Sequence, residues 1–297
     1  MKFTNPKLNF GNLRSINSCQ LLSEQLQKQG LLDAKFSSFV PLFEYLFSLF
    51  ENYKTSSSLD KASNNKPFVL GLLGPQGSGK SSLSRYLCML FEQHKHIKAQ
   101  SISIDDFYLP FEERMARGIK YRGPPGTHDM SLLSQYFEDI ERIDRKTLCS
   151  PVFDKGLHNG QGDRIALIDL PKPDLVIFEG WFAGLRSLPT IQTEVNLNLM
   201  KYEKFWNQFN ALVVLKPESF DYSFEWRIEA EKLNKSGQMT QEELRKFVSF
   251  FIEALDPSTY YGYLQQVAPH FSYPVILIEI DFSHAARSFR VISQDNC

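Results

Sequence analysis

The sequence Phe68-Val69-Leu70-Gly71-Leu72-Leu73-Gly74-Pro75-Gln76-Gly77-Ser78-Gly79-Lys80-Ser81 contains a short apolar strand followed by a phosphate-binding loop. Gly74, four further residues and Gly79-Lys80-Ser81 complete the P-loop pattern. The glycines allow successive backbone N–H groups to turn toward phosphate oxygens. The Lys80 ammonium suits the β- and γ-phosphates, and the Ser81 hydroxyl suits Mg²⁺. We therefore predict a nucleotide-binding loop formed by Gly74, Pro75, Gln76, Gly77, Ser78, Gly79, Lys80, Ser81 and Ser82.

The residues after the loop have the periodicity of an amphipathic helix. Their apolar side chains recur every three or four positions, at Leu83, Tyr86, Leu87, Leu90 and Phe91. A strand, a glycine-rich loop and a helix therefore follow one another, which is the order that a P-loop requires. The amino terminus of the predicted helix would then face the phosphates.

The composition excludes some partners and leaves the fold class open. The chain has 297 residues, 42% of them hydrophobic, and a formal net charge of −1, with 33 Lys and Arg against 34 Asp and Glu. This balance gives no overall attraction to nucleic acid or to an anionic membrane. No apolar run is long enough to span a bilayer, and the four cysteines form no Cys-x-x-Cys pair. We expect a cytoplasmic protein with reduced thiols, a monomer or a homodimer, that binds neither nucleic acid nor membrane.

The chain divides into a helical extension at residues 1–66 and a main domain at 67–297. Apolar spacing predicts two helices in the extension, the second starting near Pro41. A polar linker is expected from Thr55 to Lys66. Within the main domain, residues 219–257 are expected to form a helical lid, broken near Ser236-Gly237 and restarted by the capping box that begins at Thr240.

Five apolar strands alternate with helices in the main domain, which favours an open parallel sheet. Asp129 is expected to cap one of the helices, and a loop is expected from Pro151 to Arg164. The strands are Phe68–Leu73, Gln100–Ile104, Asp174–Phe178, Ala211–Leu215 and Val275–Ile280. The predicted fold is an α/β three-layer sandwich of the P-loop NTPase type, with a five-stranded parallel core sheet, a helical lid and an N-terminal helical extension.

Carboxylates follow two of these strands at their carboxyl ends, where ligands bind in such folds. Glu179 ends a buried apolar strand and is predicted to bind Mg²⁺ together with Ser81. Asp105 is the first polar residue after Ile104 and is the candidate catalytic base. Because adjacent side chains on an extended backbone point to opposite sides, Asp106 would instead bind metal or hold a loop.

Basic residues in two loops suit a small anionic acceptor such as a carboxylate. They are Arg122, His128, Lys155, His158 and Arg164. Arg227, on the predicted lid, could reach the γ-phosphate as an arginine finger, or form a surface ion pair with Glu231. Each of these basic residues could equally have a structural role.

Five motifs, taken in order, resemble the D-glycerate 3-kinase family, including its yeast-type ATP-dependent branch. The motifs are Gly74–Ser81, Ser103–Tyr108, Arg122–Asp129, Gly160–Arg164 and Phe178–Trp181. The resemblance extends from about Phe68 to Ile280 and is similar in plan to uridine kinase, phosphoribulokinase and pantothenate kinase. Plant members are expected to carry a basic residue where Gln161 stands, and the Pro124-Pro125 pair is closer to the yeast-type branch.

The resemblance implies an ATP- and Mg²⁺-dependent kinase in which Asp105 activates the acceptor hydroxyl and the helix bearing Arg227 is the lid. It also implies that the Arg122–Asp129 block and the loop around Lys155 line the acceptor pocket. We therefore expect Lys80, Asp105 and Arg227 to be catalytic, and Tyr108 to contact the substrate. D-glycerate, phosphorylated at O3, is the first acceptor to consider. The alternatives are a nucleoside, a pantothenate-like acid or a sugar phosphate, or a nucleotide-gated switch with no acceptor. A nucleoside would need aromatic stacking, for which the candidates are Tyr121, Phe153 and Trp181.

Overall fold

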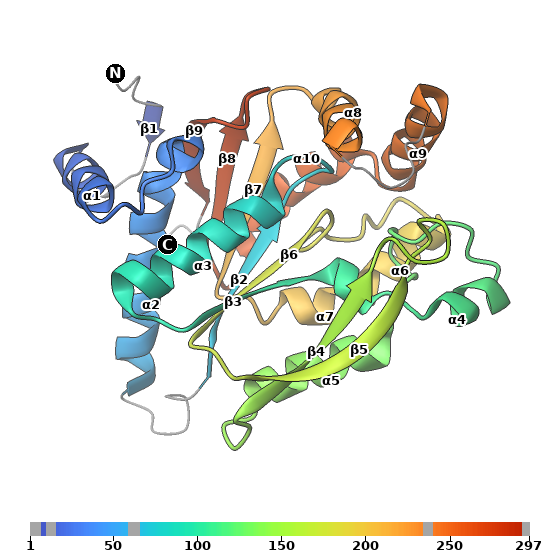
Figure 1. Cartoon of the computed structure of the whole chain (residues 1–297), viewed down its shortest axis with the longest axis horizontal. Coiled ribbons are helices and arrows are strands. Elements are labelled where there is room, and N and C mark those ends of the chain that lie inside the picture. Colours follow the sequence, from blue (N-terminus) through green and yellow to red (C-terminus); the bar gives the residue numbers. More distant parts are fainter. Residues whose placement is uncertain (1–6, 10–15, 59–65, 234–239, 293–297) are drawn as a thin grey trace.

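The computed structural model describes residues 7–9, 16–58, 66–233 and 240–292 (Figure 1). Within these residues, seven strands form one sheet in the order β1-β9-β8-β7-β2-β6-β3, and two more form a separate hairpin. The strands of the main sheet are β1 (Lys7–Asn9), β2 (Phe68–Leu73), β3 (Ala99–Ser103), β6 (Leu175–Gly180), β7 (Ala211–Pro217), β8 (Val275–Ile280) and β9 (Ala286–Ile292).

The predicted five-stranded parallel core is confirmed. Neighbouring strands among β3, β6, β2, β7 and β8 pair in parallel. The sheet is wider than predicted, because β9 pairs antiparallel with β8, and β1 pairs parallel with β9. Strand β9 has a mixture of charged and apolar residues and is only half-buried, so it lacks the continuous apolar run that identified the other strands.

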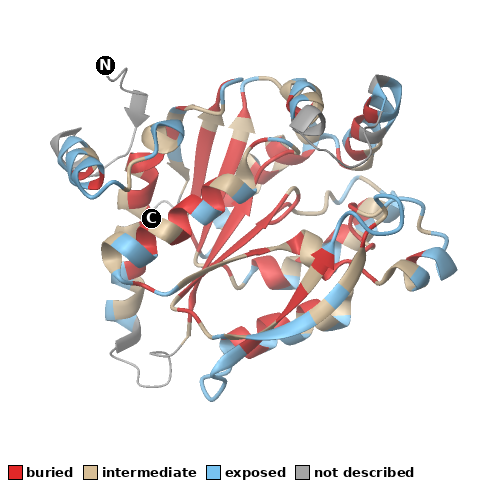
Figure 2. Ribbon diagram, viewed as in Figure 1, coloured by how far each residue is buried: buried red, intermediate tan, exposed pale blue. Residues whose placement is uncertain are grey.

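Helices cover both faces of the sheet and make the sandwich three layers thick (Figure 1). On one face, α2 (Val40–Ser58) and α3 (Lys80–Lys95) share an apolar cluster with alternate residues of the sheet, among them Leu70 and Val213. On the other face, α5 (Met130–Glu141) and α10 (Pro257–Val267) pack with the segment that contains α6 (Glu194–Met200) and α7 (Glu203–Trp206). Figure 2 shows that the central strands between these layers are buried.

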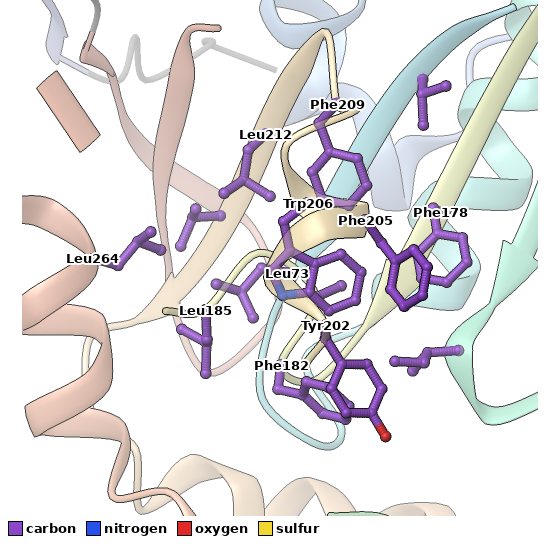
Figure 3. Packing of buried hydrophobic residues seen from close by; sticks show 14 of the residues in the cluster. Leu73, Phe178, Phe182, Leu185, Tyr202, Phe205, Trp206, Phe209, Leu212 and Leu264 are labelled. Carbon is purple, nitrogen blue, oxygen red and sulfur yellow. The ribbon is translucent and has the colours of Figure 1, made fainter. Parts of the chain in front are cut away.

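Aromatic side chains fill the second of these interfaces. Trp206 is fully buried and contacts the rings of Phe178 on β6 and Phe182 after it. Tyr202 stacks on the same indole, with 6.1 Å between ring centroids (Figure 3). This packing fixes the segment after β6 against the sheet. Glu179 is the second-to-last residue of that strand.

The N-terminal segment packs on the sheet through α2. Leu42 and Phe43 are fully buried, and Phe43 contacts Phe91 of α3 with the ring centroids 5.1 Å apart. Helix α1 (Ile16–Lys28) and the 3₁₀ helix η1 (Ala34–Phe39) precede α2. The expected linker from Thr55 is partly wrong, since α2 continues to Ser58. Residues 59–65 of that linker lie outside the described residues.

The prediction of a loop from Pro151 to Arg164 is wrong at both ends of that range. Strand β4 (Thr147–Asp154) pairs antiparallel with β5 (Asp163–Pro171) as a hairpin, and only the residues between them form a turn. The hairpin is hard to see in the sequence because β5 has charged residues at Asp163, Arg164 and Asp169 and so lacks the continuous apolar run of the core strands. In the structure β5 is exposed along much of its length, including Ile165 and Leu167 (Figure 2). Its glycine-rich turn also resembles a longer loop.

The predicted lid contains α8 (Tyr222–Leu233) and α9 (Gln241–Ala254). The predicted break at Ser236-Gly237 lies outside the described residues. The capping box is present, because Thr240 accepts a hydrogen bond from the Glu243 amide and Glu243 accepts one from the Thr240 amide. Asp129 caps α5 through the Leu132 amide, as predicted. The remaining helices are α4 (Phe111–Ala116) and the 3₁₀ turns η2 (Ile104–Phe107) and η3 (Ala268–His270).

Helix α2 should contribute to the stability of the whole domain. Leu42→Ala removes a side chain with no exposed surface, so unfolding should become easier by about 2–5 kcal/mol. Leu21→Ala on α1 is the matched control, because Leu21 is 60% exposed and its loss should cost less than about 0.5 kcal/mol. Urea denaturation of both variants measures the difference. Equal, small effects would show that α2 is not part of the cooperative core.

Candidate active site

The phosphate-binding loop connects β2 to α3. Gly77 and Gly79 have φ angles of 78° and 83°, a left-handed conformation that favours glycine. Gly79 is the residue before α3, so the amino terminus of that helix is directed into the loop. The Lys80 ammonium donates to the backbone carbonyl of Pro75 at 3.0 Å. Burial lowers the pKa of Lys80, while the nearby charges of Glu179 and Asp105 act in the opposite direction.

Glu179 lies beside the loop because β6 pairs in register with β2. Leu72 is opposite Glu179, and Leu73 is opposite Gly180. Glu179 is 5% exposed and accepts a hydrogen bond from the Ser81 hydroxyl at 2.7 Å. Two hard oxygen ligands therefore meet next to the Lys80 ammonium, which is the chemistry that Mg²⁺ prefers in nucleotide sites. Among the described residues, no three His, Cys, Asp or Glu side chains form a metal cluster by themselves.

Asp105 and Asp106 lie in a 3₁₀ turn, η2, and not on the extended backbone that the sequence suggested. The Ser103 hydroxyl accepts from the Asp105 amide at 3.2 Å, and Asp106 accepts from the Ser103 amide at 3.3 Å. Asp106 therefore holds the turn, one of its two expected roles. Burial raises the pKa of Asp106 to about 6, and the charges of Asp105 and Glu179 contribute in the same direction.

Asp105 accepts two short hydrogen bonds from opposite sides. The Lys155 ammonium donates to one carboxylate oxygen at 2.7 Å, and the Tyr108 hydroxyl donates to the other at 2.6 Å. Burial acts to raise the pKa of Asp105, but the charge and hydrogen bond of Lys155 and the hydrogen bond of Tyr108 hold it well below its ordinary value. Asp105 is therefore ionised at neutral pH. Lys155 reaches it from the turn after β4, a strand that the sequence did not predict.

The basic residues predicted to bind an acceptor have different surroundings in the structure. The prediction for His128 as a cation is wrong, because its ring is 2% exposed and burial lowers its pKa to about 3, so it is neutral. Arg164 donates to Asp129 and to the backbone carbonyl of Tyr108, both at 3.0 Å, and His158 contacts Asp163 within the hairpin turn. These two residues brace the hairpin and the loop before α5. Arg122 also reaches the hairpin turn, where its guanidinium donates to the backbone carbonyl of Gly160, and it lies 6.0 Å from the Tyr108 ring centroid. Unlike Arg164, it has no carboxylate partner among the described residues.

Figure 1 shows the lid helices at the same end of the sheet as the phosphate-binding loop. Trp226 on α8 packs so closely on the loop that a Cβ added to Gly77 would lie 2.5 Å from the Trp226 Cβ. His284 stacks on Trp226 and contacts the Gly77 carbonyl at 2.8 Å. Arg227 is the next residue on α8 and is half-buried; the side chain of Glu231, its other predicted partner, lies outside the described residues. The arginine-finger role stays a prediction.

The second lid helix covers the acceptor loop. Phe251 of α9 packs against Gly123, where an added Cβ would lie 2.2 Å from its ring, and against Trp181 with ring centroids 5.1 Å apart. Trp181 in turn donates to the Gly123 carbonyl at 3.0 Å. The lid, the acceptor loop and the residue that follows Glu179-Gly180 therefore form one contact region.

Three groups from distant parts of the sequence thus face one another at the carboxyl edge of the sheet. The charges of Asp105 and Glu179 both act on Lys80, and those of Asp105, Asp106 and Glu179 act on Lys155. Phosphoryl transfer needs a cation at the phosphates, a base for the acceptor hydroxyl and oxygen ligands for a metal. Lys80, Asp105 and the pair of Ser81 and Glu179 match these three needs.

Comparison with known proteins identifies relatives of this chain. A probable ATP-dependent kinase of Saccharomyces cerevisiae is 32% identical over 225 residues, which cover 64% of this chain and 77% of the yeast protein. The chain belongs to the D-glycerate 3-kinase and yeast-type ATP-dependent P-loop kinase family. It is therefore a phosphotransferase of the P-loop kinase class, and the family uses ATP. No protein-family model matches the chain.

Two D-glycerate 3-kinases are among the similar proteins. The chloroplastic enzyme of Arabidopsis thaliana is 32% identical over 243 residues, which cover 72% of this chain but only 53% of the plant protein. The chain thus spans about half the length of that relative. The structure of D-glycerate 3-kinase from Cryptococcus neoformans superposes with a TM-score of 0.71 at 25% identity, covering 84% of this chain and 97% of the fungal chain. The fold of this family is the one predicted from the five motifs.

Arg114 is fully buried on α4, and the sequence did not predict a role for it. Its guanidinium donates to the backbone carbonyls of Leu109, at 3.0 Å, and of Gln161 and Gly162. It therefore ties the segment after Tyr108 to the hairpin turn that carries Lys155. A lone Arg on a short helix gives no signal of this role, because its partners are carbonyls 47 and 48 residues away.

The contact between Gly77 and Trp226 generates a prediction about nucleotide binding. Gly77→Ala places a methyl group against Trp226 in a left-handed residue, so the loop must shift, and affinity for ATP should fall by about tenfold or more. Titration with a fluorescent ATP analogue measures this loss. Gly118→Ala is the control, since Gly118 has a similar φ of 69° but nothing within 4 Å of an added Cβ. If both variants bind the analogue like the parent protein, the loop does not depend on this contact.

Proposed function

We propose that this kinase transfers the γ-phosphoryl group of ATP to the O3 hydroxyl of D-glycerate. The observation that carries the proposal is the position of Asp105. It is an ionised carboxylate between the phosphate-binding Lys80 and a group of basic side chains suited to an acidic acceptor. Similarity to two D-glycerate 3-kinases supports the choice of acceptor.

The proposed reaction uses the groups in place. Asp105 accepts the proton of the acceptor hydroxyl as the oxygen forms a bond to the γ-phosphorus, and the bond from that phosphorus to the β,γ-bridging oxygen breaks, leaving ADP. Lys80 and the loop amides stabilise the charge that develops on the transferred group. Mg²⁺, which Ser81 and Glu179 would hold, supplies charge neutralisation when bound. In this proposal Lys155 keeps its hydrogen bond to Asp105 and also contacts the acceptor.

The nature of the acceptor pocket favours an acid over a nucleoside. Each aromatic residue considered for base stacking is already packed against another ring: Tyr121 on Phe250, Phe153 on Tyr108, and Trp181 on Phe251. Arg122, by contrast, is a cation near Tyr108 that donates to the Gly160 carbonyl and has no carboxylate partner among the described residues. A pantothenate-like acid and a sugar phosphate would also satisfy Arg122, and these remain the alternative acceptors. A cytoplasmic location and a monomer or homodimer stay predictions; one relative is chloroplastic.

The direct test is a screen for ADP release with ATP, Mg²⁺ and a panel of acceptors. The panel contains D-glycerate, L-glycerate, pantothenate, uridine and ribulose 5-phosphate. We expect D-glycerate to give the highest kcat/KM, because its carboxylate can bind Arg122 while O3 reaches Asp105. A higher kcat/KM for another acceptor would replace D-glycerate, and no stimulation by any acceptor would favour a nucleotide switch.

Asp105→Asn should lower kcat by about a hundredfold or more, because an amide cannot accept the hydroxyl proton. The KM for ATP should change little, since the hydrogen bonds of Asp105 join it to Ser103, Tyr108 and Lys155 and not to the phosphate-binding loop. Asp154→Asn, an exposed carboxylate at the end of β4, is the matched control and should leave both constants unchanged. Steady-state kinetics of the two variants decide the matter. Wild-type turnover by Asp105→Asn would remove Asp105 from the catalytic role.

Arg122→Gln should raise the KM for D-glycerate by about tenfold or more while leaving the KM for ATP unchanged, because one charge-assisted hydrogen bond to the carboxylate is lost. Arg117→Gln is the control, since Arg117 is exposed and forms only a surface pair with Glu113. An equal effect of both substitutions on D-glycerate would place the acceptor carboxylate elsewhere.

A further inference from the structure

The turn between β8 and β9, residues 281–285, contacts the phosphate-binding loop, and the proposed reaction gives this turn no role. Nε2 of His284 lies 2.8 Å from the backbone carbonyl oxygen of Gly77, which is 207 residues away in the sequence. A carbonyl oxygen can only accept a hydrogen bond, so Nε2 must carry the hydrogen. His284 is therefore a donor to the loop, whether or not its other ring nitrogen is protonated.

This contact fixes the peptide group between Gly77 and Ser78 at both of its polar atoms. The carbonyl accepts from His284, and the N–H donates to the Pro75 carbonyl at 3.3 Å. Because a peptide group is planar, the two bonds together set its orientation. Gly79 follows and leads into α3, whose first amides have no acceptor within the helix and are the donors available to phosphate. The orientation of the peptide thus determines how the chain enters these donors.

The turn imposes an uncommon backbone conformation on His284. Its φ is 66°, in the left-handed region that residues other than glycine seldom adopt. The His284 amide donates to the Asp281 carbonyl at 3.0 Å. The Asp281 carboxylate accepts from the Ala285 amide at 3.0 Å and from the Ser283 hydroxyl at 2.7 Å, and it pairs with Arg287. Such conformations persist where surrounding contacts impose them, and they are concentrated at functional sites.

Two further elements hold the turn in place. Trp226 of α8 stacks on the His284 ring with centroids 4.5 Å apart, and its indole N–H donates to the Phe282 carbonyl at 2.8 Å. The Ser38 hydroxyl of η1 accepts from the Ala286 amide at 3.0 Å. The lid and the N-terminal segment therefore both contact the turn, and the imidazole is presented to the loop by a constrained backbone and a stacked ring.

We infer that His284 is a positioning residue for nucleotide binding, whose Nε2–H holds the Gly77–Ser78 peptide so that the amides at the start of α3 face the phosphates of ATP. In this arrangement the stacking on Trp226 places the ring, and the hydrogen bond acts on the loop. The inference does not depend on the acceptor, because it concerns ATP, which the family uses. The sequence did not predict this role, since His284 lies beyond the last predicted strand and its partner is a backbone carbonyl.

Two substitutions separate the hydrogen bond of His284 from its ring. His284→Phe keeps an aromatic ring on Trp226 and removes the donor, whereas His284→Gln removes the ring and keeps an N–H at a similar distance from the backbone. Titration with a fluorescent ATP analogue measures both variants. We expect His284→Phe to lower the affinity by about five- to tenfold, the effect of one hydrogen bond, and His284→Gln to lower it by less than about twofold.

The order of the two affinities decides the inference. Tighter binding by His284→Phe than by His284→Gln would show that the ring acts by packing alone. Equal affinities of the two variants would show that the donor is not needed. Either result overturns the inference. If His284→Phe does not fold, His284→Ala and His284→Gln make the same comparison without a ring, and equal affinities of that pair would overturn it too.

Kinetics and a matched control complete the test. With the best acceptor of the panel, His284→Phe should raise the KM for ATP by the same factor as the loss of affinity and leave the KM for the acceptor unchanged. His96→Phe is the control, because His96 is exposed at the far end of α3 and has a similar φ of 56°, so the affinity for ATP should not change. Failure of every acceptor in the panel would refute the proposed function, and the titration would still test His284.

Discussion

The pairing register between β2 and β6 is the constraint on which the site depends. Because Leu72 is opposite Glu179, the carboxylate emerges at the level of the phosphate-binding loop and meets the Ser81 hydroxyl. A slip of one residue would turn Glu179 to the other face of the sheet and its apolar neighbours toward the loop. Burial of β6 on both faces opposes such a slip, since it would alter every packing contact of the strand. The core therefore sets the position of the metal-binding oxygens.

The acceptor side is held by a different set of interactions. Arg114 donates to the carbonyls of Leu109, Gln161 and Gly162, and so joins the β4–β5 hairpin to the segment after η2. Arg164 adds contacts from β5 to the Tyr108 carbonyl and to Asp129 at the start of α5. Through this attachment Lys155 reaches Asp105, and the two opposite charges lie together in a partly buried position. The phosphate loop belongs to the sheet, whereas the acceptor groups belong to an added hairpin. The same core is thus compatible with different acceptors, according to what the added segments present.

Much of this arrangement could be predicted from the sequence, for physical reasons that are specific to each part. The P-loop, the five central strands and Glu179 were found because buried parallel strands are continuously apolar and their ends stand out as polar residues. The hairpin was missed because β5 mixes charged with apolar residues, and its apolar side chains Ile165, Leu167 and Ile168 are exposed and not part of a buried strand. Arg114 and His284 were missed because their roles depend on partners that only the folded chain brings together. The extent of the sheet beyond β8 was missed because β9 is half-buried and mixed in composition.

The central claim is that the acceptor hydroxyl lies between the phosphate held by Lys80 and the carboxylate of Asp105. A crystal structure with a non-hydrolysable ATP analogue, Mg²⁺ and D-glycerate measures this most directly. The account predicts O3 of D-glycerate within hydrogen-bonding distance of Asp105, about 2.6–3.2 Å, and facing the γ-phosphorus opposite the bridging oxygen. D-glycerate bound at another edge of the sheet, or O3 turned away from Asp105, would contradict it.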